Sequence, residues 1–141
     1  MFSSDAIAVW PRAFALLAAV ALAGCAGVGP NGCAPGLQRM SQAQLSFGLN
    51  VADRGLVSDE EWRRFLDEEV SPRFPAGFSV VDVDGQYRNA RGGIVRERSK
   101  QLLIVGPGDD ETKLNAIRDA YKRRFNQESV LLVESPVCAA F

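Results

Sequence analysis

An apolar run near the N-terminus, closed by a single cysteine, constrains this chain more than any other feature. Residues 13–23 are all apolar, Arg12 precedes them, and small residues lead into Cys25. This pattern is typical of a secretory signal peptide. The run is too short to cross a bilayer, because a transmembrane helix needs about 20 apolar residues. We therefore expect residues 1–24 to be removed on export, so that residues 25–141 form the mature protein.

The residues at the cleavage site, Leu22-Ala23-Gly24-Cys25, match a bacterial lipobox. In lipoproteins the thiol at this position is alkylated with diacylglycerol, and the cysteine then becomes the N-terminus. Two acyl chains give stable anchoring, so lipid on Cys25 holds a domain at a membrane surface without a spanning helix. The alternative is an unmodified cysteine in a conventional signal. Ala26 follows instead of Asp, which favours the outer membrane, facing the periplasm, if the host has two membranes.

The segment after the cysteine has the composition of a linker. Residues 26–43 contain four Gly and two Pro, which favour turns and flexible chain over regular structure. We therefore predict a lipid-anchored tether over residues 25–43 and one folded domain over residues 44–141.

Charge and composition exclude several function classes. The formal net charge is −1, and together with export this argues against nucleic acid as a partner. The chain contains no histidine, the commonest general base and metal ligand. Zinc chemistry and Ser-His or Cys-His catalysis are therefore disfavoured, and we expect neither a metal nor a cofactor.

The remaining cysteines form a natural pair. If Cys25 carries lipid, Cys33 and Cys138 are left together in an oxidising compartment, and we predict a disulfide between them. In the chain-entropy model a bridge that closes a loop of about 100 residues stabilises the fold by up to about 4.7 kcal/mol. The alternative is two independent thiols.

The first half of the domain predicts a strand and a helix. Apolar residues alternate over residues 44–51, which is typical of a half-buried strand. Ser58 and Glu61 then form a capping box that begins a helix, and Pro72 ends it. The apolar stripe of this helix consists of Trp62, Phe65, Leu66 and Val70.

The second half predicts a hairpin, a helix and a strand. Strands over residues 78–87 and 95–105 are joined by a polar, Gly-containing loop over residues 89–93. Acidic residues 109–111 begin a second helix. A last strand covers residues 129–134, before Pro136. The apolar stripe of the second helix consists of Leu114, Ile117, Tyr121 and Phe125.

This order of elements predicts an α+β, ferredoxin-like two-layer sandwich, with the order βαββαβ. Two helices then cover one face of a four-stranded antiparallel sheet. In that fold the first and last strands are antiparallel neighbours, which brings Cys33 and Cys138 to the same end of the sheet. The predicted bridge and the predicted topology therefore support each other.

Several stretches in the same order resemble bacterial proteins of the domain of unknown function 3574 family. The resemblance covers about residues 44–141 and implies a small exported or lipid-anchored domain with no established activity, so it supplies no catalytic residue. The matching stretches are Phe47-Gly48, the helix from Ser58 through Phe65-Leu66, Pro72-Arg73-Phe74-Pro75-Ala76-Gly77, Gly85-Gln86-Tyr87-Arg88, Arg96-Glu97-Arg98-Ser99-Lys100, Tyr121-Lys122-Arg123-Arg124-Phe125, Gln127-Glu128-Ser129-Val130 and Val137-Cys138-Ala139-Ala140-Phe141.

The predicted hairpin holds the best candidate ligand site. If its strands pair, several cations and a hydroxyl gather beside one aromatic ring, which suits a carboxylate, phosphate or glycan ligand. Alternatively, these charges pair with Asp82, Asp84, Glu97 and the acids of the first helix, or keep a strand soluble. The candidate residues are Tyr87, Arg88, Arg96, Arg98, Ser99 and Lys100, with Gln86 beside them.

Two function classes follow from the sequence. The first is a non-enzymatic envelope lipoprotein that binds an envelope protein, a glycan or an anionic ligand, or forms a homodimer through the free sheet face. The second is a small-molecule enzyme of the dimeric α+β barrel type. In the enzyme, Tyr87, Asp82 or Arg98 supplies proton transfer or anion stabilisation. A deep apolar cavity with a perturbed carboxylate favours the enzyme, and a flat polar face disfavours it.

Overall fold

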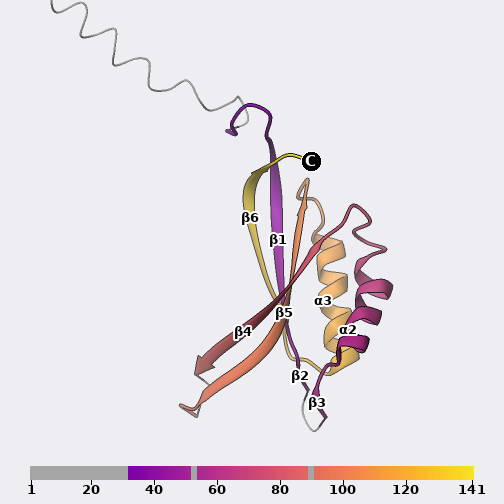
Figure 1. The fold of residues 1–141 in the computed structure, drawn as a ribbon, viewed down its shortest axis with the longest axis vertical. Coiled ribbons are helices and arrows are strands. Elements are labelled where there is room, and N and C mark those ends of the chain that lie inside the picture. The colour runs from indigo at the N-terminus through magenta and orange to yellow at the C-terminus, as the bar shows by residue number, and fades with distance from the viewer. Residues whose placement is uncertain (1–31, 52–53, 89–90) are drawn as a thin grey trace, which may run out of the picture.

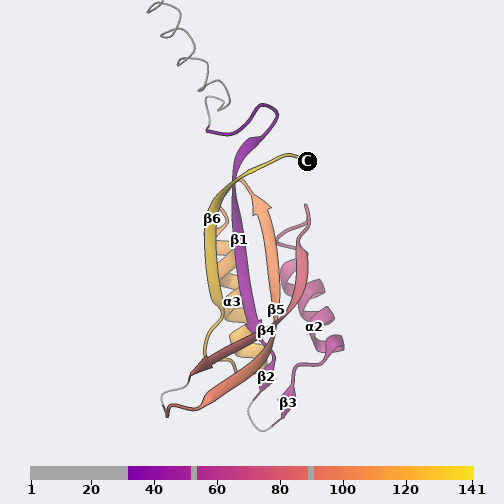
Figure 2. The same cartoon turned by 60° about the vertical axis from the view of Figure 1, so that its left-hand side comes forward.

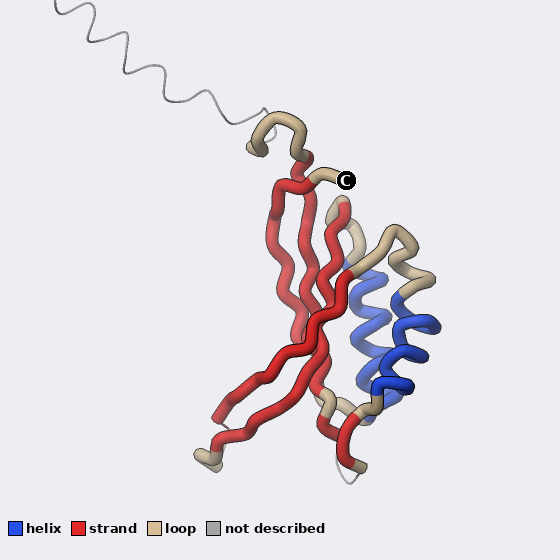
Figure 3. The backbone as a smooth tube through the Cα atoms, viewed as in Figure 1, coloured by secondary structure: helices blue, strands red, loops and turns tan. Residues whose placement is uncertain are grey.

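Four long strands form one antiparallel sheet in the computed structural model, which describes residues 32–51, 54–88 and 91–141 (Figure 1). The strands lie in the order β4-β5-β1-β6, with the bounds β1 Gln38–Gly48, β4 Ser79–Arg88, β5 Ile94–Gly106 and β6 Leu131–Ala139. The helices α2 (Asp59–Phe65) and α3 (Glu111–Phe125) cover one face of this sheet (Figure 3). The predicted α+β ferredoxin-like sandwich is thereby confirmed.

An aromatic cluster between the sheet and the helices forms the centre of the core. Phe47 of β1 meets Tyr121 with ring centroids 4.7 Å apart, and Trp62 at 5.3 Å. Edge-to-face pairs of this kind stabilise by about 0.5–1.5 kcal/mol beyond the burial of their area. The predicted stripe residues of the helices are buried, except that Leu66 is half-buried, and Ala120 is buried in addition. The buried stripe residues are Trp62, Phe65, Val70, Leu114, Ile117, Tyr121 and Phe125.

The first helix begins and ends as the sequence indicates. Ser58 Oγ accepts a hydrogen bond from the Glu61 N–H at 3.2 Å, and the Glu61 carboxylate accepts one from the Ser58 N–H at 2.9 Å. Arg54 donates to the same carboxylate at 2.5 Å. The Arg54 bond, followed by those from Ser58, lowers the pKa of Glu61 from 4.5 to about 2. Beyond α2 the chain continues as the π-helical segment η2 (Leu66–Val70), and Pro72 follows.

The strand boundaries differ from the prediction in three places. β1 begins at Gln38 instead of residue 44, so the predicted tether overlaps the strand, because residues 38–43 pair with β6 and in part with β5. Tertiary pairing outweighs local composition here. β6 continues through Pro136, which is tolerated because β6 is an edge strand, where a missing N–H need not break a ladder. Residues 50–51 leave β1 and form β2 (Asn50–Val51), which pairs with β3 (Gly55–Leu56).

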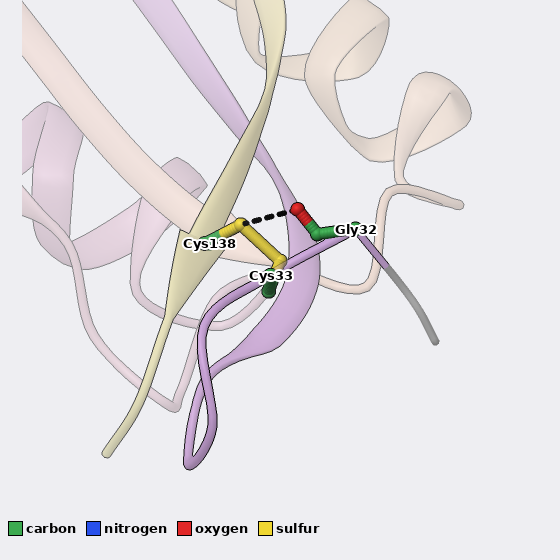
Figure 4. Close-up of a disulfide and its surroundings, with 3 residues drawn as sticks. All are labelled: Gly32, Cys33 and Cys138. Atoms are coloured by element: carbon green, nitrogen blue, oxygen red, sulfur yellow. Dashed lines mark hydrogen bonds between the residues drawn. A yellow bond between two sulfur atoms is a disulfide. The ribbon is translucent and has the colours of Figure 1, made fainter. Parts of the chain in front are cut away.

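A disulfide joins the two ends of the described chain, as predicted. The Cys33 and Cys138 sulfurs are 2.08 Å apart, and Cys33 is buried (Figure 4). The Gly32 carbonyl oxygen lies 4.0 Å from the Cys138 sulfur, which has no proton to donate in the oxidised form. The bridge therefore holds the segment before β1 against the end of β6.

The predicted signal peptide, Cys25 and the first part of the predicted tether lie outside the described residues. Within the described part of the chain, no helix has the length and apolar character that crossing a membrane requires.

We predict that removing the bridge destabilises the domain. In a Cys25→Ser background, the Cys33→Ser/Cys138→Ser double variant should lose about 2–4 kcal/mol of unfolding free energy, because its unfolded chain is no longer constrained by a crosslink. Urea unfolding of the oxidised parent and the double variant measures the difference. Equal unfolding free energies would contradict the prediction.

A second prediction concerns the acid end of the stability profile. The folded-state pKa of Glu61 is depressed, so its ionised carboxylate contributes full stability above about pH 4.5 and loses that contribution as the pH falls towards 2. The difference in unfolding free energy between the parent and Glu61→Gln should therefore shrink over this range. Urea unfolding at several pH values measures it, and Ser58→Ala, which removes part of the same network, should show a weaker pH dependence. If the unfolding free energies of the parent and Glu61→Gln differ by the same amount at every pH down to about 2, Glu61 does not have this role.

Candidate functional site

The predicted hairpin forms, and it places two of the four candidate basic residues opposite acids. The pairing of β4 with β5 sets Asp84 against Arg98 and Asp82 against Lys100. At the hairpin tip, Arg88 donates to the Gly92 carbonyl oxygen at 2.7 Å. The predicted strand pairing is thereby confirmed.

The candidate residues do not gather around one ring. Side chains alternate along a strand, so Arg96 and Arg98 lie on the same side of the hairpin as Lys100 and the buried Leu102. Tyr87 pairs with Val95, and Ser99 follows the same alternation, so both lie on the opposite side, the sheet face that the helices leave open. The expectation of a single cluster beside Tyr87 is therefore wrong.

Lys100 has a structural role in this arrangement. It is 8% exposed, and its Nζ lies 2.6 Å from Asp82 Oδ1 and 3.3 Å from Asp59 Oδ1 at the start of α2. The hydrogen bond with Asp82 raises the pKa of Lys100 and lowers the pKa of Asp82. These contacts tie β4, β5 and α2 together, which matches the alternative in which the charges pair with nearby acids.

Tyr121 is the most deeply buried titratable side chain with a shifted pKa. Its hydroxyl donates to the Gly48 carbonyl oxygen at 2.8 Å, and burial raises its pKa above the ordinary range. A phenol held in this way stays protonated at neutral pH. Tyr121 therefore fixes the end of β1 against α3 and is unsuited to proton transfer.

A hollow lies at the end of the sheet where β5 stops, and we call it the end groove. It has a volume of about 730 Å³. Its walls come from the loop before β4, the end of β5, the start of α3 and the C-terminal residue. The lining residues that the argument uses are Arg73, Phe74, Phe78, Val105, Lys113 and Phe141.

The end groove exists because β5 is longer than its neighbour. The pairing of β4 with β5 stops at Ser79 and Leu103, whereas β5 continues to Gly106 beside β1. The last residues of β5 therefore have no strand on their β4 side within the described chain. Figures 1 and 2 show this end of β5 beside the C-terminus and the start of β1, far from the hairpin tip.

The two cations at the rim of the end groove are paired with acids. Lys113 Nζ lies 2.5 Å from Asp110 Oδ1 and 5.5 Å from the centroid of the Phe74 ring. The hydrogen bond that Lys113 donates to Asp110 raises the pKa of Lys113. Arg73 donates to the carboxylate of Glu69 at 3.1 Å and to its backbone carbonyl oxygen. The rim is thus polar, while the interior is made by aromatic and aliphatic side chains.

A second, smaller hollow of about 430 Å³ lies between α2 and the end of α3. Three arginines line it, but Arg54 is bound to Glu61, Arg64 lies 3.1 Å from Glu60, and Arg124 lies 2.6 Å from Glu68. Internal acids therefore neutralise the cations that an anionic ligand needs. The sequence gives no simple signal for this hollow or for the end groove, since each draws on segments far apart in the chain.

The open face of the sheet carries a mixture of polar and apolar groups. Val81, Tyr87, Leu131 and Val133 are exposed. Between them, Glu97 packs against Gly48 so closely that any side chain at position 48 would overlap its carboxylate. Neither a deep apolar cavity nor a carboxylate with a shifted pKa is described on this face.

The described residues form no obvious metal-binding site. In residues 32–51, 54–88 and 91–141, no group of three or more Cys, Asp or Glu side chains is arranged to hold an ion.

Comparison with solved structures shows the fold in other proteins. A phage SAM lyase in complex with S-methyl-5'-thioadenosine is 22% identical, with a TM-score of 0.55 over 72% of this chain and 90% of that chain. The same enzyme in the apo state is 23% identical, with a TM-score of 0.53 over 72% and 86%. CutA from Synechococcus elongatus, at 14% identity and a TM-score of 0.47 over 72% and 80%, is more distant. At these identities the likeness concerns the fold alone.

Sequence comparison places the chain in a family. A search of curated proteins finds no match. A family model described as "Protein of unknown function (DUF3574)" matches residues 42–141, which include nearly all of the sheet and both helices. The chain therefore belongs to the DUF3574 family.

Proposed function

We propose that this protein is a lipid-anchored domain of the bacterial cell envelope that binds a ligand without catalysing a reaction. The observation that carries this proposal is the position of the end groove. It lies at the end of the sheet where the bridge holds Cys33, only eight positions after Cys25. Lipid on Cys25 brings the end groove close to a membrane, which is the outer membrane facing the periplasm if the host has two.

The chemistry of the end groove supports binding over catalysis. General acid-base catalysis needs a titratable group with a pKa near the working pH. In the groove the hydrogen bond that Lys113 donates to Asp110 raises the pKa of Lys113, so its amine stays protonated at neutral pH. Arg73 is a permanent cation that is engaged by Glu69. Neither cation is therefore suited to act as a base, and the Asp110 carboxylate of the same groove is held by Lys113.

The alternative function is an enzyme of the dimeric α+β barrel type, in which two open faces enclose a pocket. The exposed Val81, Leu131 and Val133 favour contact between two copies. Against this, Tyr87 lies on the other side of the hairpin from Asp82 and Arg98, so the candidate groups do not converge. Sedimentation of the unlipidated mature chain separates the alternatives, because a monomer at high concentration contradicts the enclosed pocket.

We predict that Cys25 alone determines membrane attachment. Cys25→Ala should move the protein from the membrane fraction to the aqueous fraction and abolish incorporation of labelled palmitate. The matched control is Cys33→Ser/Cys138→Ser, which loses two thiols but keeps the lipidation site, and it should stay in the membrane fraction. Palmitate incorporation into the Cys25→Ala chain would contradict the proposal.

A further inference from the structure

We infer that the end groove binds the acyl chain of a membrane glycerolipid, whose ester carbonyl oxygen accepts a hydrogen bond from the Val105 N–H. The nearness of the lipid rests on the proposed function. The binding itself depends only on the folded domain. It can therefore be tested with a chain that carries no lipid of its own.

The apolar lining of the end groove is the first ground for this inference. Phe74 and Phe78 close it on the helix side, Val105 lies on the strand, and Phe141 is 97% exposed at its mouth. An occupant that covers this ring removes its apolar area from water, which favours binding. The volume of about 730 Å³ falls within the range of roughly 300–1,000 Å³ that is usual for small-molecule sites.

The second ground is a backbone donor and acceptor inside this apolar lining. The Leu49 N–H bonds to the Arg98 carbonyl oxygen, and the same register continues along β1 and β5. Even-numbered residues of β5 therefore bond towards β1, and odd-numbered residues point the other way. Val105 thus directs its N–H and C=O to the β4 side, where the pairing has already stopped at Leu103. An ester carbonyl oxygen and a glycerol hydroxyl match this donor and acceptor.

The same geometry argues against a peptide as the occupant. Addition of a strand needs a row of backbone groups along the edge of a sheet. Here Val105 offers one donor and one acceptor, Pro107 has no N–H, and Gly106 ends the strand. Two hydrogen bonds do not fix the alignment of a peptide strand along β5, but they are enough to position the polar end of a lipid.

The third ground is proximity to hydrocarbon. Cys33 follows Cys25 by eight positions, and a fully extended chain over that distance spans at most about 28 Å. The end groove is therefore held near the bilayer surface whenever Cys25 carries lipid. The occupant we assign is a lipid of that bilayer and not the anchor itself, because stable anchoring needs two acyl chains in the membrane.

The test uses the mature chain with Cys25→Ser, exported behind a conventional signal so that the bridge forms. The probe is 1-monolauroylglycerol, added below its critical micelle concentration and followed by the backbone amide NMR spectrum. We expect saturable changes centred on Val105 and Phe78. The ether analogue 1-O-dodecylglycerol, which lacks the ester carbonyl, should bind about fivefold more weakly.

Two variants and one control locate the site. Phe141→Ser removes an exposed ring without touching the core and should weaken binding about tenfold. Val105→Asp places a charge at the strand residue whose backbone we assign to the ester, on the open-face side of that edge, and should weaken binding more. Ile94→Asp alters a residue that is 47% exposed at the hairpin end, and it should bind like the parent. Unfolding midpoints of all three variants show whether the fold is intact.

Three results would overturn the inference. They are no saturable binding below the micelle concentration, amide changes centred on the open face or the arginine-lined hollow, and unchanged affinity in a folded Phe141→Ser variant. Failure of Cys25 lipidation would not produce any of them, because the tested chain has no anchor. The outcome of this test is therefore independent of the anchoring experiment.

Discussion

A covalent bond between the two ends of the folded chain determines how the rest of the structure is oriented. The Cys33–Cys138 bridge joins the segment before β1 to the end of β6, a sequence separation of 105 residues. Because β1 and β6 are antiparallel neighbours, the bridge needs no distortion of the sheet. Whatever precedes Cys33 must therefore leave the domain at this one end. With the anchor that we propose at Cys25, one end of the domain faces the membrane, and the β4-β5 hairpin lies at the other end.

The end groove follows from unequal strand lengths at the same end. β5 extends beyond the start of β4, and Gly106 and Pro107 stop it before another strand could pair with it. The loop that carries Phe74 and Phe78 then closes one side of the exposed edge. The extension of β5 beyond the start of β4 thus explains three properties of the end groove. These are its apolar lining, a residue of β5 that no described strand pairs on the β4 side, and the nearness of the groove to the bridge. By contrast, the charged residues of the hairpin serve to hold β4, β5 and α2 together through Lys100.

Much of the fold could be predicted because it depends on local patterns. The capping box of Ser58 and Glu61, the apolar stripes of the helices and the pairing of Cys33 with Cys138 are all visible in the sequence. The start of β1 at Gln38 was missed because residues 38–43 are strand only through their partners in β6 and β5. The candidate site was misplaced for a related reason. Proximity along a hairpin does not bring side chains together when alternation sends Tyr87 and Arg98 to opposite sides. The end groove depends on how far β5 extends beyond β4, and the composition of these segments does not predict that length.

Measuring the orientation of the lipidated protein on a bilayer tests most directly whether the end groove faces the membrane. The mature protein in lipid nanodiscs that carry a gadolinium-chelating lipid should show strong paramagnetic broadening of backbone amides around Phe78, Val105 and Phe141. Amides near the hairpin tip, at Arg88 and Ile94, should be little affected because they lie at the far end of the sheet (Figure 2). Equal broadening at both ends, or stronger broadening at the hairpin, would contradict a membrane-facing end groove.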